Sequence, residues 1–287
     1  MHIGVVGVGA VGSFVVSQLL PKYKLSFFNR TEKSVINLKS FYKNIEIPIV
    51  LSKPIQNDTV FDWLIICVKE HQTIDVVKTV KQLVKPNTKI AVVRNGMQLQ
   101  DPFLEFVSED FILPCIIDCS IQPDDSFVYH QKSEAYIITP NNMLADEFQK
   151  LFSRFVIHFE TSDDFHTQLW KKLIESSAVG GVMALTKRSC EVFDETQYLS
   201  MFQQLVREGI NVAKADKANL PFYFYNELNQ KVLNYPKDKG SSMLTDVLAG
   251  RPIELGAKNG YISKLGKRYK IDTIEHDKIV KALTADD

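Results

Sequence analysis

The 287-residue sequence lacks an excess of charge and lacks any long hydrophobic run, and both absences exclude classes of protein. Lysine and arginine total 34 against 34 aspartates and glutamates. There is neither a basic block nor an acidic tail, which argues against a nucleic-acid-binding surface. The longest apolar runs, such as residues 63–68, have the length of a strand and are far too short to span a membrane. No basic segment precedes the first apolar run, so we expect no signal peptide.

Cysteine is scarce and shows no pattern. Cys67, Cys115, Cys119 and Cys190 form no CxxC pair, and no cluster in the sequence has metal-ligand spacing. Cys115 and Cys119 are close enough in sequence to pair or to bind a metal, but buried free thiols are the simpler interpretation. This usage is typical of a reducing compartment, so we expect a cytoplasmic protein without a metal.

Residues 1–162 alternate between strand-like and helix-like segments. The pattern predicts strands at 2–6, 24–28, 63–68, 89–93, 112–117, 135–139 and 156–159, and helices at 11–20, 32–41, 73–84 and 146–155. Such alternation is typical of an α/β fold, in which a doubly wound parallel sheet has helices on both faces.

Strand-like runs disappear after about residue 162. Helical segments are predicted at 163–185, 197–218, 222–233, 241–249, 254–269 and 274–283. We therefore expect a second, all-helical domain over residues 163–287. The chain has no internal repeat and no low-complexity segment.

The segment GVVGVGAVGSF, residues 4–14, carries a GxGxxG motif between a predicted strand and a predicted helix. The motif alone is weak, but this context is that of a dinucleotide-binding turn in a Rossmann-type domain. The first glycine allows the tight turn, the second lets a pyrophosphate approach, and the third packs the helix on the strand. N–H groups at the helix start would face the phosphates. The predicted cofactor contacts are Gly7, Val8, Gly9, Ala10, Val11 and Gly12; a glycine-rich turn without a ligand is the alternative.

The end of the second predicted strand indicates which dinucleotide is bound. NAD sites place a carboxylate there for the ribose 2′-hydroxyl, whereas this strand ends in Asn29 and Arg30. A guanidinium pairs well with a 2′-phosphate, so Asn29 and Arg30 predict NADP(H). A solvated arginine is the alternative.

Further motifs follow the next two predicted strands and recur in the helical part. Lys69 lies in VKEHQ and Asn95 in RNGM, both at carboxyl ends of predicted parallel strands, where ligands bind. The helical part contains LWKKL at 169–173, SSMLTD at 241–246, AGRPIE at 249–254 and NG at 259–260.

Taken together in this order, these segments resemble the ketopantoate reductase (2-dehydropantoate 2-reductase) family over nearly the whole chain. The resemblance implies NADPH-dependent reduction of 2-dehydropantoate to pantoate, in the pathway to pantothenate and coenzyme A. It implies an NADP-binding Rossmann domain at 1–162, a helical substrate and dimerisation domain at 163–287, and an active site between them. A homodimer is compatible with both the resemblance and the apolar helix faces.

The resemblance also assigns roles to individual residues. Lys172 matches the catalytic lysine and Glu254 a second catalytic residue, and both would contact substrate. Ser242 matches a substrate-binding serine, Lys69 a cofactor contact, and Asn95 a contact of both cofactor and substrate. In this chemistry a hydride attacks a carbonyl carbon, and a cation beside the oxygen stabilises the developing charge and supplies a proton. Lys172 is the candidate for that cation.

Helical geometry offers a partial check on Lys172. At 100° per residue, Leu169, Lys172 and Ser176 fall on one narrow arc, so Lys172 lies beside apolar neighbours. Lys171 and Glu175 are expected on the polar side. The alternative for Lys172 is a packed stem with its ammonium in water.

The sequence departs from the family where the resemblance expects asparagines, and has Ser176 and Gly180 there instead. Serine is a shorter donor and glycine has no side chain, so we expect Ser176 to contact substrate in a wider site. Arg94, before the NG turn, is expected to meet a second anionic group. Two further interpretations stay open: a reductase of another branched 2-keto acid, and a non-catalytic NADP-binding redox sensor.

The sequence also leads to expectations for Trp170 and Glu208. Trp170 is predicted to anchor the core. Glu208 is interpreted either as a buried carboxylate near the site or as part of a solvated helix face.

Overall fold

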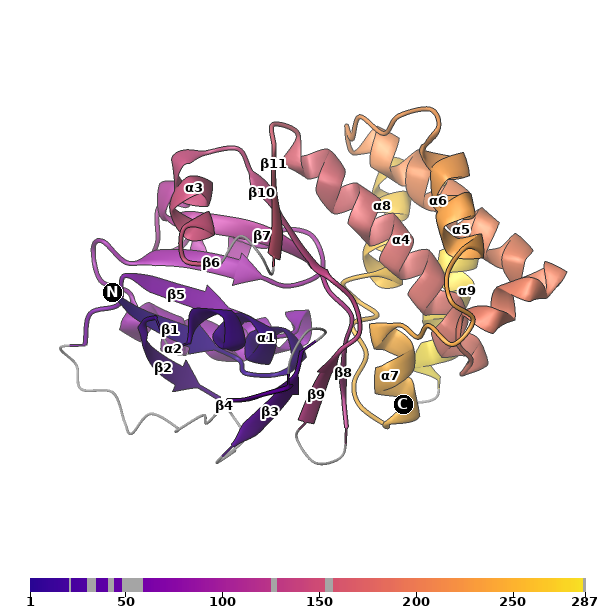
Figure 1. Cartoon of the computed structure of the whole chain (residues 1–287). Coiled ribbons are helices and arrows are strands. Elements are labelled where there is room, and N and C mark those ends of the chain that lie inside the picture. Colours follow the sequence, from indigo (N-terminus) through magenta and orange to yellow (C-terminus); the bar gives the residue numbers. More distant parts are fainter. Residues whose placement is uncertain are drawn as a thin grey trace. The chain divides into compact units, whose positions relative to one another are not determined.

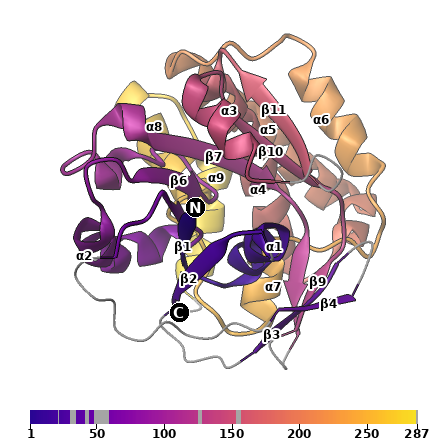
Figure 2. The same ribbon diagram turned by 60° about the vertical axis from the view of Figure 1, so that its left-hand side comes forward.

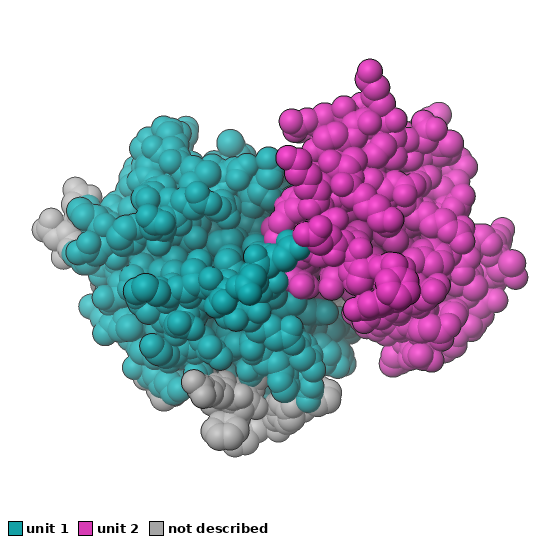
Figure 3. All heavy atoms as spheres, turned by 90° about the horizontal axis from the view of Figure 1, so that it is seen from above, with its two compact units in different colours: residues 1–165 teal, residues 166–287 magenta. Residues whose placement is uncertain are grey.

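The computed structural model describes residues 1–20, 22–29, 35–40, 44–47, 59–124, 128–152 and 157–285 (Figure 1). The chain divides into two compact units, an N-terminal unit of residues 1–165 and a helical unit of residues 166–287 (Figure 3). The functions that the sequence assigns to the two parts remain predictions.

The N-terminal unit is built on a seven-stranded sheet with the order β11-β10-β7-β6-β5-β1-β2. Its strands are β1 (His2–Val6), β2 (Lys24–Phe28), β5 (Trp63–Ile66), β6 (Lys89–Val93), β7 (Ile112–Asp118), β10 (Ala135–Pro140) and β11 (Ile157–Ser162). Neighbours from β2 to β7 are parallel, β10 is antiparallel to β7, and β11 is parallel to β10. The predicted Rossmann-type α/β fold is confirmed. The strand order reverses at β1, which is where such sheets bind ligands.

The central strands β1, β5 and β6 are buried on both faces of the sheet. Val5, Ile65 and Val93 belong to a core cluster that includes residues of α1 (Ala10–Leu19) and α3 (Met143–Gln149). Their neighbours Val6 and Ile66, which point the opposite way, are buried as well. Figure 2 shows α1 and α2 (Thr73–Leu83) on opposite sides of β1. Burial on both faces explains why these strands read as continuous apolar runs.

A second sheet of four strands was not predicted. Its order is β4-β3-β9-β8, formed by β3 (Ile36–Lys39), β4 (Asn44–Ile47), β8 (Ile121–Pro123) and β9 (Val128–Gln131). The predicted helix at 32–41 is therefore wrong over 36–39, and residues 32–34 and 41 lie outside the described residues. Ile36 and Leu38 are fully buried and alternate with more exposed neighbours, which is the period of a strand.

Other predicted elements are present with shifted ends. Helix α3 begins earlier than predicted because the Asn142 side chain caps it, accepting a hydrogen bond from the Ala145 amide (2.9 Å). Strand β5 ends at Ile66, and the predicted strand at 156–159 is β11, of which residue 156 lies outside the described residues.

The described residues of the helical unit, 166–285, contain no strand, which confirms the all-helical prediction. The helices are α4 (Phe165–Thr186), α5 (Thr196–Ala215), α6 (Phe224–Leu233), α7 (Ser242–Leu248), α8 (Asn259–Tyr269) and α9 (Ile274–Thr284). Helix α8 starts five residues later than predicted, because 255–258 form a turn and Lys258 has non-helical backbone angles.

A buried hydrogen-bond network connects helices α4, α5, α8 and α9. The Asn259 side-chain amide donates to the Ser177 carbonyl (3.1 Å) and to His276 Nδ1 (3.1 Å). His276 Nε2 in turn donates to the Leu205 carbonyl (3.0 Å). Asn259 and His276 are both fully buried. The network therefore fixes His276 as a neutral imidazole that carries its proton on Nε2.

Glu208 is half-buried and caps a helix, a contact that neither interpretation of this residue included. Its carboxylate accepts hydrogen bonds from the backbone amides of Glu275 and His276 (3.0–3.1 Å) and so caps α9. Burial raises its pKa, an effect that outweighs the lowering by these hydrogen bonds. Trp170 is confirmed as a core anchor: it is fully buried, and its indole N–H donates to Asp216 (2.9 Å).

Candidate functional site

The glycine turn after β1 has the geometry that its sequence predicts. Gly7 has φ +86°, and its amide donates to the Phe28 carbonyl (2.9 Å). A Cβ on Gly7 would lie 2.5 Å from Val68 Cγ1, and one on Gly12 would lie 2.0 Å from the Gly7 carbonyl oxygen. A Cβ on Gly9 would meet no atom within 4 Å. Two glycines are thus required by packing, whereas Gly9 leaves the surface of the turn open, as a pyrophosphate needs.

The start of α1 suits an anion. Ala10 and Val11 are its first residues, Gly9 precedes it, no side chain caps it, and its first turn has no acidic residue. Helix-start N–H groups and the helix dipole favour negative charge there. Asn29 at the end of β2 accepts a hydrogen bond from the Val8 amide (3.2 Å), so it shapes the turn directly. These features fit a dinucleotide. Arg30 lies outside the described residues.

Lys69 and Asn95 follow β5 and β6 and are half-buried. The Lys69 carbonyl accepts hydrogen bonds from the Gln72 amide (3.0 Å) and the Thr73 hydroxyl (3.3 Å), which fixes the turn after β5. Strand β5 is next to β1 and β6 is next to β5, all three parallel, so both residues follow carboxyl ends on the same edge of the sheet as the glycine turn.

Arg94 supports the loop that follows β6. Its side chain is buried, and its guanidinium donates to the carbonyls of Asn95 (3.0 Å) and Gln98 (3.5 Å). The loop needs this support because Gly96 and Gln98 both have positive φ. Arg94 thus braces the loop that carries Asn95. Contact of Arg94 with a second anionic group stays a prediction.

Lys172 lies half-buried on α4, with an ionised neighbour that the helical pattern did not reveal. Glu175 was expected on the polar side, but its side chain is only 18% exposed. It accepts hydrogen bonds from the Tyr235 hydroxyl (2.5 Å) and from Lys231 (2.8 Å). Burial raises the pKa of Glu175, but the charges of Lys172 and Lys231 and these hydrogen bonds outweigh it and lower the pKa. Glu175 is thus a carboxylate held ionised close to Lys172.

The two positions where asparagines were expected are occupied differently. Ser176 is half-buried, and its hydroxyl donates to the Leu173 carbonyl of its own helix (3.3 Å). Gly180 is buried, and a Cβ there would lie 3.0 Å from Met243 Sδ. Because Met243 of α7 fills the space beside Gly180, the glycine does not widen the site as expected. It allows α4 and α7 to approach closely.

Gly180→Asn is expected to lower the free energy of unfolding by about 1–3 kcal/mol, because the new side chain must displace Met243 from a packed contact. Gly180→Ala is the matched control. It adds only a Cβ and gains about 1 kcal/mol of helix propensity, so its net effect should be small. Urea unfolding measures both. An asparagine variant as stable as the alanine variant would show that Met243 does not restrict this position.

Ser242 of α7 contacts a lysine of the turn that precedes α8. Ser241 caps α7, accepting a hydrogen bond from the Leu244 amide (3.1 Å), while Ser242 is exposed as the first helical residue. The Ser242 hydroxyl accepts a hydrogen bond from Lys258 Nζ (3.0 Å). Glu254 is buried, with 7% exposed. Lys258 was not predicted as a site residue, although it lies one residue before the NG dipeptide and four after Glu254.

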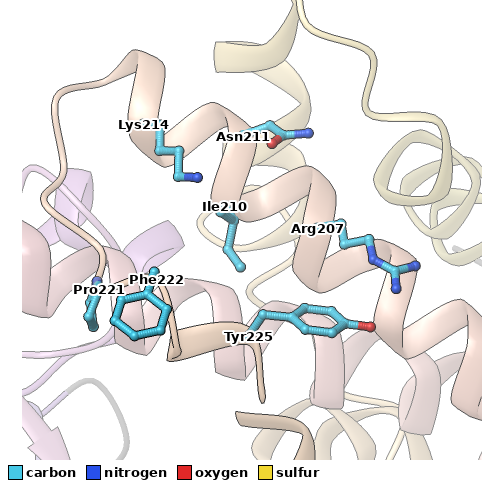
Figure 4. A pocket seen from close by; sticks show the side chains of 7 residues that line it. All are labelled: Arg207, Ile210, Asn211, Lys214, Pro221, Phe222 and Tyr225. Atoms are coloured by element: carbon cyan, nitrogen blue, oxygen red, sulfur yellow. The ribbon is translucent and has the colours of Figure 1, made fainter. Parts of the chain in front are cut away.

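A hollow of about 260 Å³ lies elsewhere in the helical unit, between α5 and α6 (Figure 4). It contains none of the predicted site residues and is lined by Arg207, Ile210, Asn211, Lys214, Pro221, Phe222 and Tyr225. The Arg207 guanidinium lies over the Tyr225 ring, 4.8 Å from its centre. Several of its lining side chains, such as Arg207 and Phe222, are exposed, so the hollow lies at the surface. Lys172 does not line it.

The described residues contain no group of three histidine, cysteine, aspartate or glutamate side chains able to hold a metal ion. No helix among them is both long enough and apolar enough to cross a membrane. None of the four cysteines forms a disulfide bond, and three of them are buried.

Comparison with known proteins gives matches over the whole chain. A family model described as "Ketopantoate reductase PanE/ApbA" matches residues 3–142, and its C-terminal counterpart matches residues 164–286. A 2-dehydropantoate 2-reductase of Mycobacterium tuberculosis strain H37Rv is 28% identical over 290 residues, covering 99% of this chain and 97% of that protein.

Solved structures share the fold. A dimeric ketopantoate reductase from Staphylococcus aureus aligns with a TM-score of 0.85 at 23% identity, covering 99% of this chain and 98% of that one. A D-mandelate dehydrogenase bound to NADH and anilino(oxo)acetate also gives a TM-score of 0.85, at 20% identity, with coverage of 99% and 97%.

Proposed function

The chain belongs to the ketopantoate reductase family, and from this we propose that it reduces 2-dehydropantoate to pantoate with NADPH. The observation that carries the proposal is that both halves of the family model match, in order, a chain whose glycine turn has the required geometry. The proposal assigns the cofactor to the N-terminal unit and the proton donor to the helical unit.

The residues present fit the chemistry of a 2-keto acid reductase. When bound, the reduced nicotinamide supplies the hydride for the C2 carbonyl of the substrate. The Lys172 ammonium stabilises the negative charge on the carbonyl oxygen and donates the proton that completes the alcohol. Ionised Glu175 offsets part of the lysine's charge. Ser242 binds the substrate carboxylate and Glu254 its hydroxyl.

The purified chain should oxidise NADPH when 2-keto acids are added, which absorbance at 340 nm measures. A panel containing 2-dehydropantoate, 2-ketoisovalerate and pyruvate separates a reductase from a redox sensor. The sensor binds NADPH without turnover, so tight NADPH binding with no oxidation by any keto acid would contradict the proposal.

Arg30→Ala is expected to weaken NADPH binding by about tenfold or more while leaving NADH binding nearly unchanged. The reason is that a hydrogen-bonded charge pair with the 2′-phosphate contributes about 1.5–3 kcal/mol, and NADH lacks that phosphate. Fluorescence titration of both cofactors measures the ratio, and NADH is the internal control. An unchanged preference would remove Arg30 from the site.

A reductase of another branched 2-keto acid is the second candidate. It is favoured by Ser176 and Gly180, which replace the expected asparagines, and by the fold shared with a D-mandelate dehydrogenase. Rates with 2-ketoisovalerate distinguish the two candidates, as described in the Discussion.

The proposal extends to assembly and location. A homodimer is supported by the dimeric S. aureus relative of the same fold. Sedimentation analysis should give about twice the 32.7 kDa chain mass, and a monomer would exclude it. The proposed location is the cytoplasm, since four cysteines without a disulfide bond suit a reducing compartment.

A further inference from the structure

Lys258 is among the largest fully buried side chains of the protein, with only 2% of its surface exposed. Lysine is almost never buried to this extent unless its charge is paired, because removing an ammonium from water is costly. Neither the family resemblance nor the proposed mechanism uses Lys258. It lies in the turn between Glu254 and α8, directly before the Asn259 that ties α8 to the core.

The contact of Lys258 with Ser242 determines how that serine can act. Lys258 Nζ donates to Ser242 Oγ at 3.0 Å. A serine hydroxyl has one donor and two acceptor positions, whereas an ammonium can only donate. With one acceptor position occupied by Lys258, the Ser242 O–H is left to donate in another direction. Ser242 is exposed while Lys258 is buried, so the hydroxyl is the outward end of the pair.

Two carboxylates, Asp246 and Glu254, belong to the same helix as Ser242 and the same turn as Lys258. Asp246, on the same helix as Ser242, is paired with Arg251 (3.1 Å). Glu254 is the buried carboxylate of the same turn as Lys258. The group that contacts the exposed Ser242 hydroxyl from the buried side is a cation, and this suits an anionic ligand group.

The donors that the family resemblance expects on α4 are also weak in this chain. The Ser176 hydroxyl donates to its own helix, and Gly180 has no side chain. The carboxylate of a 2-keto acid still requires hydrogen-bond donors. Ser242 on α7 and Lys258 in the turn before α8 provide a hydroxyl donor with a cation behind it.

We propose that Lys258 is a positioning and specificity residue for the substrate carboxylate. Its Nζ holds Ser242 so that the serine O–H donates to that carboxylate, and its charge favours an acid over an uncharged analogue. This inference rests on the proposed function, in which Ser242 binds a 2-keto acid.

The test compares 2-dehydropantoate with its uncharged carboxamide in the full-length enzyme. Lys258→Met should raise KM for the acid about tenfold or more, change kcat less than threefold, and leave KM for the carboxamide nearly unchanged. Lys258→Arg retains the charge and should recover part of the loss. NADPH affinity should be unchanged in both variants.

A double-mutant cycle separates this role from a structural one. Ser242→Ala should also raise KM for the acid more than for the carboxamide, and Ser242→Ala combined with Lys258→Met should be little worse than Lys258→Met alone, because the two residues act together. Equal losses for acid and carboxamide, or additive effects, would overturn the inference.

Circular dichroism shows whether Lys258→Met folds. If it does not, Ser242→Ala and Lys258→Arg test the inference without it. An equal rise in KM for the acid and the carboxamide in Ser242→Ala would then overturn the inference. A wild-type enzyme that fails to oxidise NADPH in the presence of every 2-keto acid tested would instead refute the proposed function.

Discussion

Lys172→Ala is expected to lower kcat by a factor of about 10²–10⁴ while leaving the Kd for NADPH within about threefold. The loss follows from removing the group that stabilises the carbonyl oxygen's charge and donates its proton. Cofactor binding should persist because the glycine turn, Asn29 and Lys69 belong to the other compact unit. Steady-state rates and fluorescence titration of NADPH measure the two quantities.

The neighbouring lysine provides a matched control. Lys171 lies on the same helix with similar exposure, and Lys171→Ala removes the same charge and a similar stem. It should keep most of the turnover. Equal loss in both variants would point to a structural effect on α4, and turnover that survives Lys172→Ala would remove Lys172 from the catalytic role.

Acidification from pH 6.5 to pH 4 is expected to lower the free energy of unfolding by about 3 kcal/mol through His276 alone. Burial lowers the pKa of His276 to about 4, from an ordinary value of 6.5. Between these values the unfolded chain binds a proton that the folded chain does not, so stability falls as the pH falls. Each unit of pKa difference corresponds to about 1.4 kcal/mol. The contribution is fully present above pH 6.5.

The contacts of His276 give this shift its physical reason. A proton added to Nδ1 would face the Asn259 amide, which already donates to that nitrogen (3.1 Å). His276→Gln retains donor and acceptor atoms but cannot titrate, so its unfolding free energy should depend less on pH in this range.

Urea unfolding at several pH values, followed by helical circular dichroism, measures the effect. His71→Gln removes an exposed histidine and is the control, which should keep the wild-type slope. A His276→Gln profile that parallels the wild type would show that another group carries the dependence.

The sequence predicted the elements whose signal is local. The glycine turn between β1 and α1 was readable because packing dictates Gly7 and Gly12. Buried strands β1, β5 and β6 were apparent as apolar runs bounded by polar residues. These features depend on neighbours within a few residues.

Other features depend on partners distant in sequence. Strand β3 pairs with β4 and with β9, whose residues 128–131 lie far along the chain, so its short alternation was mistaken for a helix. The burial of Glu175 depends on Tyr235 and Lys231, and Gly180 faces Met243. Helical periodicity on α4 indicates a face but not what covers it.

The central claim is best tested by comparing kcat/KM for 2-dehydropantoate and 2-ketoisovalerate with saturating NADPH. The two acids differ in a hydroxymethyl group, which only 2-dehydropantoate carries. A site that hydrogen-bonds its hydroxyl through a buried carboxylate such as Glu254 discriminates against the analogue that lacks it. We predict that 2-dehydropantoate is favoured by at least about tenfold. Equal or reversed values would contradict the assignment to 2-dehydropantoate.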